Sequence, residues 1–275
     1  MPFTVSHIAA VLPGYRPLTR ARIFTAAVIG SMVPDFGVVL PSRILSLLLP
    51  GGVSRLGTHS LVGLFTFCLP VGLVTYWLTL LLIRPAALEV LPDGAYVRLR
   101  AAPPPPSIKQ LSAWLYAAAA LLLGACTHLV WDAFTHENAR GVRMFPLLTD
   151  YGPEMSGHPI QLYRWLQHGS SAVGLAVVAG ALVLWLRDAP APPEPPVRRI
   201  APPERLAWLG AYVLPAVLAM AWRASRPWGP NMTAFNNSFA LGVLVILGLR
   251  IAVDSLLLVS GLILARVAVS RHRLD

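Results

Sequence analysis

Long runs of apolar residues divide the chain and predict helices that cross a membrane. They occupy Leu61–Ile83, Leu111–Trp131, Ser171–Leu186, Leu206–Trp222 and Phe239–Ala265. The first two approach the roughly 20 residues that a helix needs to span the hydrocarbon core of a bilayer. No segment shows the alternation of apolar and polar residues that is typical of strands, and helices satisfy their own backbone in lipid. The pattern predicts an all-α, polytopic membrane protein with about five transmembrane helices.

Two shorter apolar runs, Ile23–Val33 and Ile44–Pro50, precede the first predicted span. Both are too short to cross a bilayer alone, so we expect N-terminal interfacial helices, packed at the membrane surface or partly within it. Pro34 disfavours helix in the residue before it, which places Asp35 in a break after the first of these helices. The N-terminus lacks a basic region followed by a long apolar core, which argues against a cleaved signal peptide.

Proline-rich segments mark the expected domain boundaries. Ala102–Ser107 and Ala189–Pro203 cannot continue a helix and are predicted to be exposed linkers. The second linker separates a motif-bearing membrane domain, residues 1–188, from a C-terminal pair of transmembrane helices, residues 206–275, through a Pro/Arg-rich linker at 189–205.

Composition and charge agree with a membrane protein. Of the 275 residues, 56% are hydrophobic and only 12% are charged, about half the share of charged residues in soluble domains. The net charge of +10 is almost wholly arginine, because Lys109 is the only lysine. Arginine-rich loops beside spans mark the cytoplasmic side of a membrane, and no dedicated basic module indicates nucleic-acid binding.

Candidate chemistry appears where the second predicted span ends. His128, Asp132 and His136 follow one another at four-residue spacing, so on a helix they form a slowly drifting stripe. Imidazole and carboxylate are preferred ligands of zinc and its neighbours, and ionisable residues inside a span are functional candidates by default. The stripe predicts a metal site, with a purely structural polar cluster as the alternative.

The predicted topology brings further candidates to the same membrane face. His59 lies just before the first long span and His168 just before the third, while His7 and Asp35 belong to the N-terminal region attached to that face. Each also has a structural alternative: the histidines as caps or interfacial residues, and the carboxylate as a solvated one. The candidate metal ligands are His7, Asp35, His59, His128, Asp132, His136 and His168.

Five motifs together resemble a known family. They are Pro2-Phe-Thr-Val-Ser-His7, Gly30-Ser-Met-Val-Pro-Asp35, Thr58-His-Ser-Leu61, Thr127-His-Leu-Val-Trp-Asp-Ala-Phe-Thr-His136 and Gln167-His-Gly-Ser-Ser171. In order and residue type they resemble an uncharacterised bacterial membrane family, domain of unknown function 4184, which looks akin to YdjM-like membrane-bound metal-dependent hydrolases. The resemblance implies a multi-pass protein of the bacterial plasma membrane.

A more distant likeness is to bacterial zinc-dependent phospholipases C, through the order of the ligands. That resemblance implies that Asp35, His59, His128 and Asp132 hold one metal ion, that His136 and His168 hold a second, and that His7 reaches a third. The chain lacks the additional carboxylate that follows the last histidine in those enzymes, since it continues Ser170-Ser-Ala-Val-Gly, and this departure weakens the case for a third ion.

The sequence therefore predicts a metal-dependent hydrolase of phosphate esters, with one or two zinc ions, acting on an anionic lipid or lipid-linked substrate. Asp35 is the candidate for orienting or deprotonating water. Arginine-rich Arg84–Gln110, Arg187–Arg205 and the tail from Arg266 share one face, which places the site on the extracytoplasmic face. A non-catalytic scaffold with a structural metal is the alternative. A transporter is a further one, suggested by Arg250 and Asp254 in the last span, although a buried structural ion pair would also explain those two residues.

Overall fold

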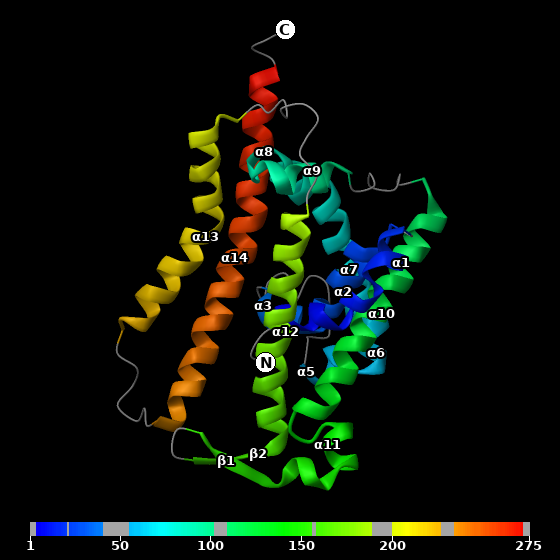
Figure 1. Ribbon diagram of the computed structural model, residues 1–275, viewed down its shortest axis with the longest axis vertical. Helices are drawn as coiled ribbons and strands as arrows, with labels where there is room; N and C mark the ends of the chain where they lie inside the picture. Colours follow the sequence, from blue (N-terminus) through cyan, green and yellow to red (C-terminus); the bar gives the residue numbers. More distant parts are fainter. Residues whose placement is uncertain are drawn as a thin grey trace. The chain divides into compact units, whose positions relative to one another are not determined.

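The computed structural model describes residues 4–20, 22–40, 55–101, 109–155, 158–188, 200–226 and 234–271. The described chain is helical apart from one short two-stranded hairpin (Figure 1). The second interfacial run, Ile44–Pro50, and most of both proline-rich linkers lie outside the described residues. The all-α prediction is confirmed.

Five helical segments are long and apolar enough to cross a membrane, as predicted. They are Leu61–Val90, Leu111–Thr135, Leu162–Arg187, Pro202–Ala224 and Val243–Val269. The third begins nine residues before the predicted Ser171, at Leu162. Residues 162–170 are half polar, so hydropathy marked only the apolar part of a helix that extends beyond it.

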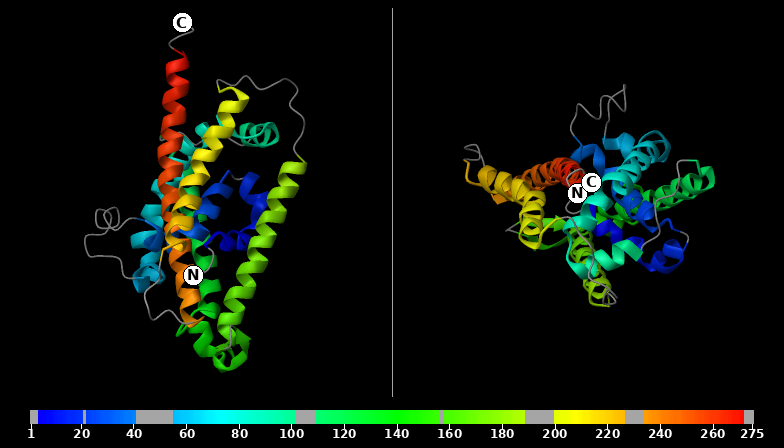
Figure 2. Two further views of the ribbon diagram at one scale, coloured as in Figure 1. Left: turned by 90° about the vertical axis from the view of Figure 1, so that its left-hand side faces the viewer. Right: turned by 90° about the horizontal axis from the view of Figure 1, so that it is seen from above.

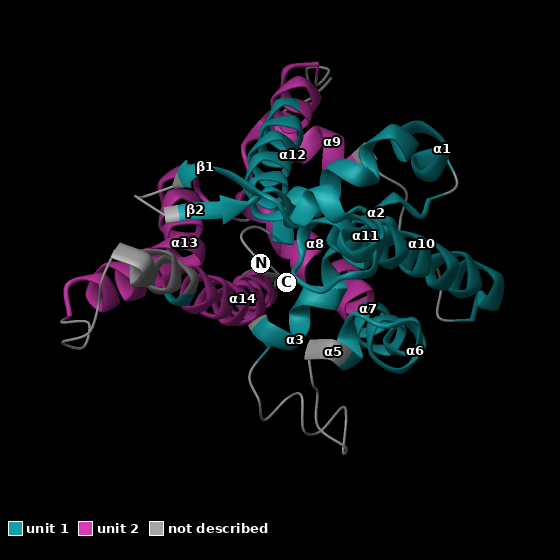
Figure 3. Cartoon of the chain, turned by 90° about the horizontal axis from the view of Figure 1, so that it is seen from below, with its two compact units in different colours: residues 1–74, 108–180, 228–243 teal, residues 75–107, 181–227, 244–275 magenta. Residues whose placement is uncertain are grey.

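The chain forms two compact units, each assembled from separate stretches of sequence (Figure 3). Unit 1 comprises residues 1–74, 108–180 and 228–243, and unit 2 comprises residues 75–107, 181–227 and 244–275. The helical spans Leu61–Val90 and Leu162–Arg187 each contribute to both units.

Unit 1 contains all the residues that the sequence singled out as ligands. Its N-terminal elements are η1 (Thr4–Ala10), η2 (Leu12–Gly14), α1 (Tyr15–Arg20), α2 (Phe24–Met32), η3 (Val33–Asp35) and α3 (Phe36–Val39). The next are α5 (Arg55–Thr58), α6 (Leu61–Gly63), η4 (Leu64–Cys68) and the first part of α7 (Leu69–Leu78). The last are α10 (Leu111–Thr135), α11 (Arg140–Met144), η6 (Pro146–Thr149), β1 (Tyr151–Met155), β2 (His158–Gln161) and most of α12 (Leu162–Arg187).

Helices α2 and α10 touch through their backbones, because glycine stands at both contact points. A Cβ added to Gly30 would lie 2.1 Å from the carbonyl oxygen of Leu121, and one added to Gly124 would lie 2.2 Å from that of Ala27. Small residues permit such close approach, the usual device by which helices pack in membranes. Gly124 lies one helical turn before His128, so this crossing sets α2 and η3 directly against the ligand-bearing end of α10.

The end of α10 differs from the expected continuous stripe. The helix stops at Thr135, His136 is extended (φ −120°, ψ 142°), and Asn138 has a positive φ of 59° that asparagine tolerates better than most residues. His136 therefore lies just beyond the helix that carries His128 and Asp132.

The hairpin between α11 and α12 was not predicted. Strands β1 and β2 pair antiparallel, with Tyr151 opposite Gln161 and Glu154 opposite Pro159, and the register is irregular between Tyr151 and Glu154. Prolines at 153 and 159 and a glycine at 152 interrupt the alternation by which strands are recognised in a sequence.

Unit 2 contains η5 (Thr79–Ile83), α8 (Arg84–Val90), α9 (Asp93–Ala101), α13 (Pro202–Ala224) and most of α14 (Ala234–Arg271). Helices α13 and α14 lie side by side (Figure 2), joined by a 3.0 Å hydrogen bond between the hydroxyls of Tyr212 and Ser260. Ile200 and Ile263 are fully buried in its apolar core. Arg250 and Asp254 are exposed, so the expectation that these two side chains are buried is wrong, while their pairing stays a prediction.

Candidate metal centre

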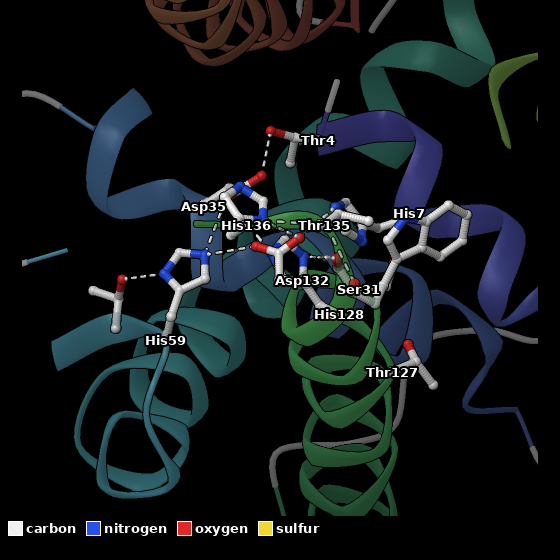
Figure 4. A network of polar contacts seen from close by, with 12 residues as sticks. Thr4, His7, Ser31, Asp35, His59, Thr127, His128, Asp132, Thr135 and His136 are labelled. Carbon is white, nitrogen blue, oxygen red and sulfur yellow. Dashed lines mark hydrogen bonds and ion pairs between the residues drawn. The ribbon is translucent and has the colours of Figure 1, made fainter. Parts of the chain in front are cut away.

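Polar side chains from four parts of unit 1 meet at the end of α10 (Figure 4). Element η1 contributes His7, η3 contributes Asp35, the turn between α5 and α6 contributes His59, and α10 contributes His128 and Asp132. Asp35 and His128 are buried, with exposed fractions of 1% and 0%, and Asp132 is 8% exposed. Such burial of ionisable groups is costly unless they are paired or bind an ion.

Asp35, His59, His128 and Asp132 offer four ligand atoms that all lie within 4.8 Å of one another. His59 Nε2 lies 3.2 Å from Asp35 Oδ1 and 3.5 Å from Asp132 Oδ2, while His128 Nε2 lies 3.5 Å and 3.4 Å from the same two oxygens. Four ligands held at about 2.1 Å in a tetrahedron lie about 3.4 Å from one another. The four distances between histidine and aspartate atoms are therefore close to those around a tetrahedral ion, and this buried group could hold a metal ion.

Hydrogen bonding decides which nitrogen of His128 faces the other ligands. Its Nδ1 lies 2.7 Å from the backbone carbonyl oxygen of Ser31, which can only accept a hydrogen bond, so Nδ1 carries a proton. In the neutral ring, Nε2 then presents a lone pair, and this buried atom has no hydrogen-bond partner. A lone pair facing two carboxylate oxygens is repulsive. A cation at this point, either a proton or a metal ion, removes the conflict.

Hydroxyl groups orient two of the other ligands, Asp35 and His59. The Thr4 hydroxyl donates a 2.8 Å hydrogen bond to Asp35 Oδ2, which leaves Oδ1 directed at the two histidines. The Thr58 hydroxyl lies 2.9 Å from His59 Nδ1, so that Nε2 of the same ring points toward Asp35 and Asp132. Contacts of this kind fix the tautomer and the orientation of metal-binding side chains.

The two carboxylate oxygens of Asp132 have different neighbours. Its Oδ2 belongs to the four-ligand group, whereas its Oδ1 lies 3.6 Å from His7 Nε2 and 3.4 Å from His136 Nδ1. The two oxygens of one carboxylate thus face two different pairs of histidines. This arrangement is suited to a carboxylate that is shared between two cations.

The His7 ring is stacked on the His128 ring, with centroids 3.8 Å apart and an interplanar angle of 18°. The pKa of His7 is lowered to about 4, mainly because the ring is buried and secondly because His128 lies beside it. The His7 imidazole is therefore neutral at pH 7, the form in which histidine binds a metal.

His136 and His168 end in different surroundings. His136 Nε2 lies 3.1 Å from the side-chain nitrogen of Gln167, and the assignment of oxygen and nitrogen in that amide follows the hydrogen-bond network. With the amide oxygen turned to accept from Nε2, Nδ1 of His136 would present a lone pair, and it lies 3.2 Å from the Thr135 hydroxyl and 3.4 Å from Asp132 Oδ1. His168 is exposed on α12, and within the described part of the chain no contact joins it to the other candidates. The structure therefore brings six of the seven candidate ligands together and leaves His168 apart.

Sequence reasoning missed the supporting residues. Thr4, the Ser31 carbonyl and Gln167 each hold a ligand in place, yet a hydroxyl, a backbone group or an amide carries no distinctive spacing. The one signal for these residues in the sequence is their position inside the family motifs. Thr4 and Ser31 lie within the first two motifs, and Gln167 is the first residue of the last motif.

Fold and site together define a polytopic membrane protein with a buried histidine–aspartate group that could hold a metal ion. The chain belongs to the family described as Domain of unknown function (DUF4184), whose model matches residues 1–264. No curated protein and no solved structure matches the chain. The family likeness is thereby confirmed, whereas the kinship with YdjM-like hydrolases stays a prediction.

Proposed function

We propose that this protein is a membrane-bound, metal-dependent hydrolase of phosphate esters in lipid or lipid-linked substrates. The observation that carries the proposal is the four-ligand group, with the buried, unpartnered Nε2 of His128 directed at two carboxylates. A divalent ion bound there would supply Lewis acidity and, with water as a fifth ligand, would lower the pKa of that water. Zinc is the proposed ion, because two imidazoles and two carboxylates in a tetrahedral arrangement suit it.

A second zinc ion is proposed on the other face of Asp132, between His7 and His136. It rests on the distances of 3.6 Å and 3.4 Å from Oδ1 to the two rings. This grouping differs from the one that the phospholipase C likeness implies, in which His136 shares an ion with His168. Four neutral histidines and two aspartates carry a charge of −2 and two zinc ions carry +4, so the pair would form a cationic centre. Such a centre attracts the anionic oxygens of a phosphate ester.

Asp35 and Asp132 have different roles in this proposal. Both oxygens of Asp35 are engaged, Oδ2 by Thr4 and Oδ1 by His59, and the side chain is buried, which favours a role as ligand. Its role in directing water stays a prediction. Asp132 is the carboxylate that both proposed ions share.

Lipid is the proposed substrate class because the centre lies at the end of a membrane-spanning helix. Asp132 and His128 belong to the last two turns of α10, where a span reaches the interfacial region. A phosphate ester in a lipid headgroup lies close to that depth, where the headgroup region meets the hydrocarbon. We place the protein in the bacterial plasma membrane with the centre on the outer face, and a reporter fused to the C-terminus should accordingly read as cytoplasmic.

The test begins with the protein purified in detergent and loaded with zinc. The parent should hydrolyse at least one member of a panel of phospholipids, lipid phosphates and soluble phosphodiesters, and a chelator should abolish that activity. His128→Gln should bind less zinc and be inactive while keeping the helical content of the parent. His168→Gln, at the candidate that lies apart, is the matched control and should retain both zinc and activity.

Two results would contradict the proposal. Absence of zinc from the parent would remove the metal centre altogether. A parent that binds zinc tightly, hydrolyses nothing in the panel and unfolds on substitution of His128 would instead identify a closed structural site, as in the scaffold alternative.

A further inference from the structure

An apolar groove lies beside the candidate centre within unit 1, between η1 and α10. Its volume is about 400 Å³, and its lining consists of Ala10, Cys126, Thr127, Val130, Trp131 and Phe134. The one hydroxyl in this lining is occupied, because the Thr127 side chain donates a 2.7 Å hydrogen bond to the carbonyl oxygen of Gly124 on its own helix. The groove therefore offers almost no polar group to an occupant.

The groove opens on an exposed face of α10, one of the helices that are long and apolar enough to cross a membrane. Val130 is 63% exposed and Phe134 is 36% exposed, both on the helix that crosses the bilayer. From Cys126 to Phe134 the helix rises about 12 Å, a distance that several carbons of an extended chain would cover. An apolar groove at this depth is continuous with the hydrocarbon of the bilayer, so a lipid chain is the occupant that its surroundings supply.

Trp131 connects the groove to the candidate centre. Its ring lies 5.3 Å from the His7 ring, tilted by 60°, and its Nε1–H donates a 3.0 Å hydrogen bond to the hydroxyl of Ser170. That hydrogen bond fixes the indole between η1, α10 and α12. One side chain thus lines the groove and also contacts a candidate ligand, so a molecule that fills the groove ends beside the centre.

We propose that this groove holds a hydrocarbon chain of the phosphate-bearing lipid whose headgroup binds at the candidate metal centre. The inference rests on the proposed function and adds how the substrate is positioned. Bilayer hydrocarbon is as apolar as the groove, so the groove contributes little affinity. Its contribution is orientation, because a chain held along α10 aligns the phosphate with the ligands at the helix end.

The probe for the test is a phosphonate analogue of phosphatidic acid that carries a diazirine in one acyl chain. The control probe is a diacylglycerol with the same photoreactive chain. The zinc-loaded protein is reconstituted into phosphatidylcholine nanodiscs with either probe and irradiated, and mass spectrometry measures labelling of residues 126–134. The phosphonate is not a phosphate ester, so labelling does not depend on turnover.

The phosphonate should label the groove about fivefold more than diacylglycerol, a preference of about 1 kcal/mol. Val130→Trp should fill the groove and abolish the excess. Leu115→Trp is the matched control, because Leu115 is equally exposed at 62% and lies about four turns earlier on the same helix. It should leave the labelling unchanged.

A second way to block the groove avoids any folding problem of the variant. Cys126 is exposed and Cys68 is buried, so a hexyl maleimide added to the folded parent should modify Cys126 and displace the probe. In Cys126→Ser the reagent should have no effect.

Equal labelling by the two lipids would overturn the inference, as would undiminished labelling after the groove is blocked. If no substrate is hydrolysed but the phosphonate still labels the groove preferentially, the proposed reaction fails while the chain site stands. If hydrolysis is found but labelling is equal, only the chain site fails.

Discussion

Replacing Gly124 with alanine should empty the candidate metal centre without changing any ligand. The added Cβ would lie 2.2 Å from the carbonyl oxygen of Ala27 and 2.7 Å from the backbone nitrogen of Ser31. Ordinary contacts of a Cβ lie at 3.4–4 Å and real ones essentially never fall below 3.0 Å, so α2 must move away from α10 by about 1 Å. Both clashing atoms belong to backbone, so no side chain can rotate to relieve them.

A displacement of about 1 Å is large for metal ligation, in which distances are held to about 0.2 Å. Helix α2 leads directly into η3, so Asp35 would move away from His59 and His128. The carbonyl of Ser31 would also move away from His128 Nδ1, which it contacts at 2.7 Å. We expect zinc affinity to fall by at least the 10–100-fold that is typical when supporting contacts are lost. Overpacking should also cost about 1–3 kcal/mol of stability.

The assay is zinc stoichiometry and affinity of the detergent-purified protein, followed by thermal unfolding with and without zinc. Gly180→Ala is the matched control, because a Cβ at this helical position on α12 meets nothing within 4 Å. It should leave zinc binding unchanged. If Gly124→Ala binds zinc with the affinity of the parent, the contact between α2 and α10 does not position the ligands and the reasoning fails.

Three further predictions concern the ligands themselves. Asp132→Asn should lower zinc stoichiometry further than His136→Gln does, because Asp132 faces both proposed ions; equal losses would argue against a shared carboxylate. Thr4→Val removes the hydroxyl that holds Asp35 and should weaken zinc binding by about tenfold, measured by competition with a chelator, whereas unchanged affinity would exclude this positioning role. Acidification from pH 7 toward pH 4 should release zinc, because protons compete for the histidine lone pairs, and it should also destabilise the zinc-free protein. The direction of the second effect follows from His7, whose pKa is lowered from 6.5 to about 4 in the folded state. The contribution of His7 to the free energy of unfolding is therefore complete above pH 6.5. It falls between pH 6.5 and pH 4, because the unfolded chain binds a proton there and the folded chain does not. Thermal unfolding measured across this range checks it, and a zinc-free protein that gains stability on acidification would contradict it.

The hydrophobic pattern alone determined the helical class and the approximate spans of this protein, because a bilayer demands long apolar helices whatever their partners. It located the ends of those spans less well. The third span begins at Leu162, where polar residues continue the helix, and the hairpin at Tyr151–Gln161 escaped notice because proline and glycine disrupt its alternation. Ordering the candidate ligands by topology predicted that all seven lie at one membrane face, and six of them meet in the structure.

Only the tertiary structure decided which candidates meet and which atoms face one another. His168 and Gln167 are neighbours in the chain, yet it is Gln167 that contacts His136, because helix phase and the end of α10 at Thr135 set the direction of each side chain. The meeting of Asp35 with His128 depends on backbone contact at Gly30 and Gly124, where glycine has no side chain that would mark the contact in the sequence. Spacing along a sequence specifies which residues share a face of one helix. The distance between different helices is set by packing, and that distance determines whether a group of ligands can hold an ion.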